Sequence, residues 1–193
     1  MSINKDNRDQ EDLLNTLRGL IISLRKNMKD KYKRTTALAD LLTDRWEKAN
    51  FLGFGEGSSV YDDCLVIGDV DVGSNCWIGP YTILDGSGGL MIEDYVTVSS
   101  GVHIYTHDNI LQTLTSGASN IVHSSVLVKK NVYIGANSII NKGVTIGNYS
   151  VIAANSFVNR DIPEYSIYAG TPATKIGDVI VDDKGVTLEY IDR

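Results

Sequence analysis

The sequence has few of the residue types that mark several common protein classes. Its 193 residues include 2 cysteines, 3 histidines and 3 prolines. Cys64 and Cys76 match no common zinc motif, and we expect both to be small core residues in a reducing compartment. No apolar run reaches the ~18 residues of a membrane-spanning helix. The charged start of the chain contains no apolar signal region, so we expect a cytoplasmic protein without membrane insertion.

Positive charge is missing from the middle of the chain. Residues 51–128 contain no Lys or Arg and 9 acidic residues, whereas residues 1–50 contain 11 basic and 8 acidic residues. Residues 129–193 contain 7 of each, and the basic residues resume at Lys129 and Lys130. A nucleic-acid-binding protein needs a broad basic face, so this distribution argues against nucleic acid as a partner. It leaves room for a local anion site in the last third of the chain.

The first fifty residues predict helices. One apolar stripe recurs at steps of three and four residues and consists of Leu13, Leu14, Leu17, Leu20, Ile21, Leu24 and Met28. A weaker helical pattern runs through residues 36–50. We expect a helical extension over residues 1–50 that packs on the main body or on a partner subunit, or that shapes a substrate pocket.

From Phe51 onward, an aliphatic residue recurs at every sixth position. A small or β-branched residue often follows four positions later, and Gly often follows directly. A six-residue unit is long enough for a short strand and a turn, and three units make one triangular coil of a parallel β-helix. About fifteen units between Val60 and Pro163 predict a mainly β fold of about five coils. The aliphatic positions are Val60, Val66, Val72, Ile78, Leu84, Ile92, Val98, Ile104, and again Val122, Val128, Ile134, Ile140, Ile146, Ile152 and Val158.

The stretch "VYIGANSIINKGVTIGNYSVIAANSF" closely resembles the hexapeptide-repeat acyltransferases, in particular bacterial sugar O-acetyltransferases such as the maltose and galactoside group. The resemblance covers residues from about 60 to 177, and "IPEYSIYAGTPATKI" strengthens it. It implies a left-handed parallel β-helix over residues 51–177. Tyr133 stands where the family usually has Trp, which is a mild departure. Residues 178–193 alternate on both sides of Lys184-Gly185 and predict a short C-terminal hairpin.

The repeat fails after about His107. Residues from about 107 to 121 are polar and contain Gly, Ser, Thr and Asn, which predicts an inserted loop. In the resembling family, a histidine at the point where a loop leaves the β-helix is the general base, and the resemblance gives this role to His107. An imidazole can accept the proton of an attacking hydroxyl or amine near neutral pH and return it to the leaving thiolate. The group that orients its second nitrogen stays open.

The other residues near this break are candidates for lining the acceptor pocket: His103, Tyr105 and Asp108. We expect His123 to pack at a corner after the loop. Three histidines could also hold zinc, as in the carbonic-anhydrase-like branch that resembles the same fold. That branch draws its ligands from widely separated coils, whereas His103 and His107 share one segment and the loop separates them from His123. We therefore expect no metal.

A coenzyme A site needs a narrow groove with accessible backbone amides and cations at one end. By resemblance, the backbone amide of Ala136 is the oxyanion donor. Asn159 stands where the family often has Thr, and Lys175 is separated from Pro172-Ala173 by Thr174, so single phosphate contacts stay open. The candidate cations are Lys129, Lys130, Lys142, Arg160 and Lys175, and the resemblance places coenzyme A contacts at Ala136, Ala154, Asn159, Arg160 and Lys175.

The resemblance implies an acetyl-coenzyme A-dependent acetyltransferase that forms a homotrimer with active sites between adjacent subunits. The lack of cations in residues 51–128 argues against nucleotide binding by that half, although the helices in residues 1–50 could bind a nucleotide. We therefore favour O-acetyl transfer to a sugar hydroxyl, in surface polysaccharide or lipopolysaccharide biosynthesis. The nearest alternative is N-acetylation of a nucleotide-linked amino sugar. An antibiotic acetyltransferase and a non-catalytic trimeric β-helix scaffold stay open as further alternatives.

Overall fold

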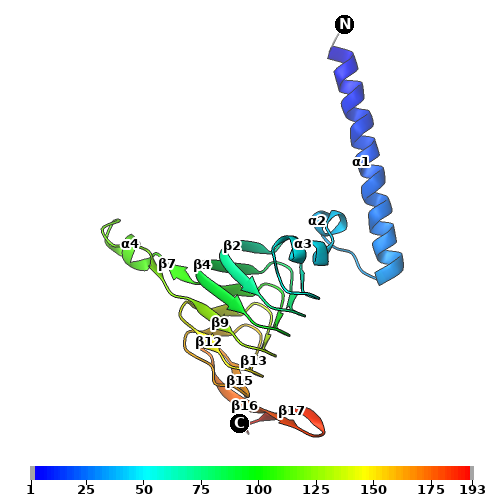
Figure 1. Ribbon diagram of the computed structural model, residues 1–193. Helices are drawn as coiled ribbons and strands as arrows, with labels where there is room; N and C mark the ends of the chain where they lie inside the picture. Colours follow the sequence, from blue (N-terminus) through cyan, green and yellow to red (C-terminus); the bar gives the residue numbers. More distant parts are fainter. Residues whose placement is uncertain (1–2, 192–193) are drawn as a thin grey trace. The chain divides into compact units, whose positions relative to one another are not determined.

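The computed structural model describes residues 3–191 and divides the chain into two compact units, one up to Asp44 and one from Arg45 onward. The first unit contains α1 (Ile3–Tyr32) and the short α2 (Leu38–Leu42), shown in Figure 1. The predicted helices are thus confirmed, but α3 (Arg45–Phe51) belongs to the second unit. No helix in the described part of the chain is long and apolar enough to cross a membrane.

The second unit is a parallel β-helix of about six turns with three faces (Figure 1). Where the repeat is regular, successive strands on a face are 18 residues apart, as in Val60 opposite Ile78 and Ile134 opposite Ile152, so three hexapeptides make one turn. The slip lengthens this spacing to 20 residues between Leu84 and Ile104, and the insertion lengthens it to 36 between Ile104 and Ile140. Six parallel strands form the first face, which confirms the β-helix and adds one turn to the expected five. These strands are β1 (Ser59–Val60), β3 (Trp77–Ile78), β5 (Thr97–Val98), β10 (Tyr133–Ile134), β13 (Val151–Ile152) and β15 (Ser166–Ala169).

The other two faces share their first two strands. β2 (Leu65–Val72) and β4 (Ile83–Ile92) each run around a corner, since the start of β4 pairs with β6 and its end with β9. The second face continues with β6 (His103–Ile104), β11 (Ile139–Ile140) and β14 (Phe157–Val158). The third face continues with β9 (Val126–Val128) and β12 (Thr145–Ile146).

The interior of the β-helix is a column of aliphatic side chains from the hexapeptide positions. Burial of each such side chain removes it from water, which stabilises the fold by about 1.5–3 kcal/mol per residue. The small residues between them are buried too, and so are both free cysteines, Cys64 and Cys76. Fully buried members include Val60, Ile78, Leu84, Val98, Ile104, Ile134, Ile140, Ile146, Ile152 and Val158.

The glycines of the repeat allow neighbouring coils to lie close together. A Cβ atom on Gly135 would lie 2.5 Å from the amide nitrogen of Ala154, and one on Gly79 would lie 2.7 Å from that of Ser100. The residue with a left-handed backbone conformation is not the glycine itself but the residue two positions later, for example Asn137, whose φ is 59°. The corner therefore needs Gly because the next coil leaves no space for a side chain.

The insertion is a small hairpin rather than an irregular loop. It consists of β7 (His107–Asp108), α4 (Ile110–Leu114) and β8 (Val122–His123). Val122 was expected to resume the repeat, but it pairs antiparallel with Asp108 and is 37% exposed. The buried column resumes only in β9. At the C-terminal end of the β-helix, β16 (Thr174–Asp182) and β17 (Gly185–Tyr190) form the predicted antiparallel hairpin.

Candidate active site

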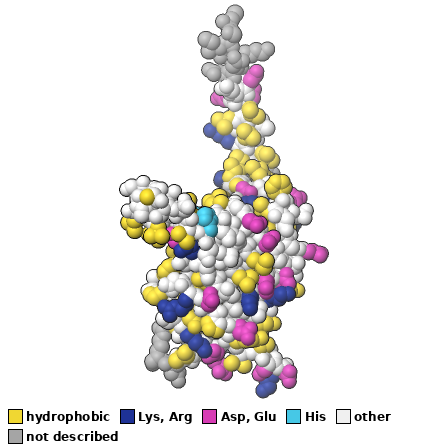
Figure 2. All heavy atoms as spheres, turned by 60° about the vertical axis from the view of Figure 1, so that its left-hand side comes forward, with side chains coloured by type: hydrophobic (Ala, Val, Ile, Leu, Met, Phe, Trp, Pro, Cys, Tyr) yellow, Lys and Arg dark blue, Asp and Glu magenta, His cyan; other side chains and the backbone are white. Residues whose placement is uncertain are grey.

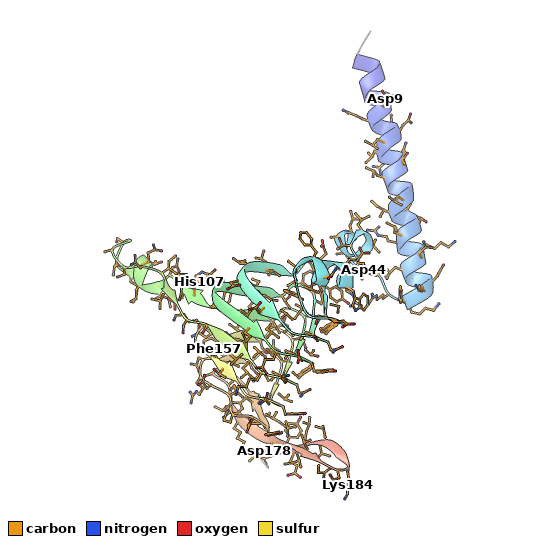
Figure 3. All side chains as sticks on the ribbon, viewed as in Figure 1. Asp9, Asp44, His107, Phe157, Asp178 and Lys184 are labelled. Atoms are coloured by element: carbon orange, nitrogen blue, oxygen red, sulfur yellow. The ribbon has the colours of Figure 1, made fainter. Side chains whose placement is uncertain are left out.

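His107 forms a dyad with a buried carboxylate. Its Nδ1 lies 2.7 Å from Oδ2 of Asp85, which comes from the preceding coil. The Asp85 side chain is 1% exposed and that of His107 is 35% exposed. Because a carboxylate only accepts hydrogen bonds, this contact places the imidazole proton on Nδ1 and leaves Nε2 as the proton acceptor. Figure 3 shows His107 at the start of the inserted hairpin.

Asp85 is held as an anion by donors around both of its oxygens. The amide and the hydroxyl of Ser87 donate to Oδ1 at 3.0 and 2.6 Å, and the Thr106 amide donates to Oδ2 at 2.8 Å. Burial favours the neutral acid, but the hydrogen bonds from Ser87, Thr106 and His107 outweigh it and hold the pKa of Asp85 well below its usual value. The ionised carboxylate can therefore fix the orientation of the imidazole.

Asp85 was absent from the residues predicted from sequence. It lies at the two-residue slip of the repeat, directly after Leu84, while the insertion begins shortly after Ile104. Leu84 and Ile104 are opposite each other in neighbouring strands, so the slip and the insertion meet at one corner of the β-helix. The slip at Asp85 and the insertion after Ile104 lie one turn apart, and this coincidence was the signal in the sequence for a contact between Asp85 and His107.

His123 lies beside His107 rather than at a packed corner. The two residues are opposite each other in the β7–β8 pair, with ring centroids 5.8 Å apart, and His123 is exposed. The insertion thus brings together two histidines that it was expected to separate. His103 lies apart, on the second face, with its Nδ1 3.3 Å from the Tyr105 hydroxyl. Among residues 3–191, no cluster of three His, Cys, Asp or Glu side chains is placed to hold a metal ion.

Asp108 ties the insertion to the next coil instead of presenting a free carboxylate. Its Oδ2 lies 2.5 Å from Nζ of Lys142, and this hydrogen bond, with the Ile110 amide, lowers the pKa of Asp108. Lys142 was expected among the cations of a donor site, but this ion pair occupies it. Lys130 and Lys175 also form ion pairs, with Asp94 and Asp178.

Comparison with known proteins identifies the family to which this fold belongs. The family described as bacterial transferase hexapeptide (six repeats) matches residues 125–160. AntD, an N-acyltransferase from Bacillus cereus in complex with dTDP and 3-hydroxybutyryl-CoA, is 32% identical, with a TM-score of 0.59 over 64% of this chain and 70% of that chain. The chain belongs to the hexapeptide-repeat bacterial transferases. It is therefore an acyltransferase of this family.

A second relative supports the same family. The hexapeptide-repeat acetyltransferase VCA0836 from Vibrio cholerae is 26% identical to this hexapeptide transferase, with a TM-score of 0.56 over 85% of this chain and 91% of that chain. Its complex with acetyl coenzyme A gives 25% identity and a TM-score of 0.52 over 83% and 87%. No curated protein sequence matches this hexapeptide transferase.

Four of the five predicted donor residues of this hexapeptide transferase lie at two different corners, and the fifth, Lys175, lies in β16. Ala136 and Ala154 stack at the corner after the first face, where the Asn155 amide donates to the Ala136 carbonyl at 2.9 Å. Within residues 3–191, the amides of Ala136 and Ala154 donate no backbone hydrogen bond. Asn159 and Arg160 are exposed at the corner after the second face, where His107 also begins. One face, roughly 15–20 Å of chain at 3.3 Å per residue, separates the two corners.

The inserted hairpin of this hexapeptide transferase forms an arm with exposed apolar side chains on α4, shortly after His107 in the chain. Ile110, Leu111 and Leu114 are 59%, 52% and 76% exposed. Figure 2 shows histidine atoms at the base of the arm and hydrophobic side chains along it. The His107 side chain is thus accessible to solvent, and the hairpin that begins with it presents apolar side chains.

Proposed function

We propose that this chain transfers an acyl group from an acyl-coenzyme A to the amino group of a nucleotide-linked amino sugar. The observation that carries the proposal is the 32% identity with AntD, whose complex holds dTDP and 3-hydroxybutyryl-CoA. AntD also has a crystal structure with dTDP-4-amino-4,6-dideoxyglucose and coenzyme A. The relationship therefore favours N-acylation over the O-acetylation expected from the sequence.

The lack of Lys and Arg in residues 51–128 does not exclude a nucleotide-linked acceptor. Residues 51–128 lack Lys and Arg, but backbone N–H groups and helix N-termini can also bind phosphate groups. A diphosphate bound in this way needs no basic side chain from that half of the chain. The apolar arm at Ile110, Leu111 and Leu114 would border the acceptor.

The proposed reaction uses the dyad as a proton carrier. The neutral amine of the acceptor attacks the thioester carbonyl carbon, forming a C–N bond and a tetrahedral oxyanion. Nε2 of His107 takes the proton from the attacking nitrogen, and Asp85 stabilises the imidazolium through Nδ1. The C–S bond then breaks, and the imidazolium gives the proton to the departing thiolate. The products are an amide and free coenzyme A.

We assign the donor side to residues at these two corners of the β-helix and to Lys175 of β16. The free amide of Ala136 would donate to the oxyanion, which stabilises the transition state by about 2.7–4 kcal/mol. The small side chain of Ala154 would leave room for the pantetheine arm. Arg160 and Lys175 would meet phosphate groups, Lys175 after release from Asp178. A homotrimer would bring the two corners of neighbouring chains together.

Transfer to a sugar hydroxyl is the second candidate, and the dyad itself is the observation in its favour. A hydroxyl is a weak nucleophile until a base takes its proton, whereas a neutral amine can attack before losing one. A base as well oriented as His107 therefore suits an alcohol acceptor too.

An acyl-transfer assay distinguishes the two candidates. The purified chain is given acetyl-CoA or 3-hydroxybutyryl-CoA with a dTDP-linked 4-amino sugar, with the matching 4-hydroxy sugar, or with free sugars, and release of coenzyme A thiol is measured. We expect release with the amino sugar at least about 10-fold above the hydroxy sugar, a discrimination of ~1.4 kcal/mol. Release with the hydroxy sugar alone would establish the second candidate. If calorimetry detects no binding of either thioester, the chain is a scaffold.

A further inference from the structure

The long helix α1 presents leucines to solvent. Leu13, Leu14, Leu17 and Leu20 are 60%, 46%, 46% and 49% exposed on a helix of 30 residues. Figure 2 shows hydrophobic atoms along this helix. An exposed stripe of this kind is costly in water, and a helix outside a packed core gains most of its stability from burying such a stripe.

The spacing of these leucines is that of a coiled-coil seam. Leu13, Leu17, Leu20 and Leu24 follow steps of four, three and four residues, the pattern in which one helix packs against another. Polar residues continue the same seam at both ends, Gln10 before the leucines and Asn27 after them. The stripe therefore has a defined length and a centre between Leu17 and Leu20. Leu24 at one end of the seam is half-buried, as are Ile21 and Met28 beside the seam.

The charges of α1 decide which partner fits the stripe. Residues 9–17 carry three acids and no base, for a net charge of −3. Residues 18–32 carry five bases and one acid, for a net charge of +4. A parallel copy of α1 would place like charges side by side, and an anionic membrane would repel the acidic half. An antiparallel copy places each half against its opposite.

We propose that α1 pairs with α1 of a second copy of this chain in an antiparallel coiled coil. Leu17 packs against the partner's Leu20, and Leu13 packs against the partner's Leu24. In this register, Glu11 is level with the partner's Lys26 and Asp12 with the partner's Arg25. The helix pair has twofold symmetry, so the assembly contains an even number of chains, whatever the β-helix does by itself.

The polar ends of the seam favour this register over the two registers that are shifted by one heptad. Sliding one helix by one heptad in either direction places a leucine opposite Gln10 or opposite Asn27, because the stripe ends at these residues. Only the proposed register places all four seam leucines of each helix opposite leucines.

The first test is the mass of the full chain in solution by light scattering. The double variant Leu17→Glu/Leu20→Glu should have half the mass of the wild type, because charges at the centre of the seam separate the pair. Ile22→Glu is the matched control, since Ile22 is 65% exposed and lies on the opposite side of the helix, and it should leave the mass unchanged. An unchanged mass in the double variant, or an equal loss in the control, would overturn the proposal.

The second test determines the direction of the helices by disulfide cross-linking. Leu13→Cys and Leu24→Cys chains are oxidised separately and after co-expression with different affinity tags, beside the wild type as background. An antiparallel pair cross-links only in the co-expressed sample, because equivalent cysteines would be 11 residues apart, about 16 Å along the helix. Cross-linking of either variant alone indicates parallel helices and contradicts the proposal, as does the absence of a cross-link in every sample.

A third measurement addresses a membrane as the partner. The wild type and Leu17→Glu/Leu20→Glu are centrifuged with phosphatidylglycerol vesicles at ~0.15 M salt. We expect the wild type to remain in the supernatant. If it pellets with the vesicles and the double variant does not, the stripe is a lipid-binding face and the proposal is wrong.

Discussion

At the scale of single residues, Asp85 should matter to turnover without contacting the substrate. In Asp85→Asn the side chain keeps its size but loses the negative charge that orients and stabilises the imidazolium of His107. We expect kcat to fall by at least about 10-fold, up to the ~10⁴-fold lost when a Ser-His-Asp triad has its Asp replaced by Asn, with KM for both substrates unchanged. Steady-state kinetics checks this split. A loss confined to KM would show that Asp85 acts on binding instead.

The same carboxylate links stability to pH. The pKa of Asp85 is below its ordinary value of 3.8 in the folded chain, so the unfolded chain takes up this proton first as the pH falls. The stabilisation is complete above about pH 5 and is lost as the pH drops through the acid range, at up to about 1.4 kcal/mol per pH unit. Urea unfolding at several pH values should give Asp85→Asn a flatter profile than the wild type in this window. Parallel profiles would contradict the assignment.

His107 could be predicted from the sequence, and Asp85 could not. The end of the repeat indicates His107 directly, because a side chain at the start of an insertion no longer packs in the regular coils of the β-helix. Asp85 lies 22 residues earlier, beside a slip that by itself indicates only an irregular corner. Their contact depends on the strand register between two turns, which the period alone does not give when one turn contains two extra residues and the next contains an insertion.

At the scale of elements, the corner glycines should tolerate no side chain. Gly135→Ala places a Cβ 2.5 Å from the Ala154 amide nitrogen, a contact that only a shift of the coil backbone can relieve. We expect a loss of about 1–3 kcal/mol in the free energy of unfolding of the β-helix. Gly19→Ala in α1 is the matched control, because nothing lies within 4 Å of its Cβ and Ala favours helix. Calorimetric scans of both variants measure the difference, and an undiminished stability of Gly135→Ala would refute the packing argument.

The periodic elements followed from the sequence, but the insertion did not. A six-residue period predicts strand, turn and interior position together, which is why most of the predicted positions from Val60 to Val158 are buried as expected. Val66 is only partly buried. Val122 fits the same frame by spacing, yet it pairs with Asp108 in the hairpin. The period reports only the spacing of residues along the chain. A side chain at such a position is buried only if the chain has already rejoined the β-helix there. The β7–β8 pair is too short to produce a periodic pattern in the sequence.

At the scale of the whole molecule, one chain holds the parts of the proposed site at two corners. His107 and Arg160 are at the corner after the second face, and Ala136 is at the corner after the first. Since a face separates them, base and oxyanion donor can act on one thioester only if a neighbouring chain supplies the second corner. A cyclic trimer does this three times with the same contact.

Mixing two inactive variants tests this arrangement. His107→Ala removes the base, and Ala136→Pro removes the amide proton of the oxyanion donor. Each variant alone should lose about 10²-fold or more in kcat while eluting as the same oligomer as the wild type. After unfolding and refolding at equal amounts, a site with its two corners from different chains is intact when one chain keeps His107 and its neighbour keeps Ala136. Random assortment makes this about one quarter of the sites, so about one quarter of the wild-type activity should return. If both residues acted within one chain, the mixture would remain as inactive as its components.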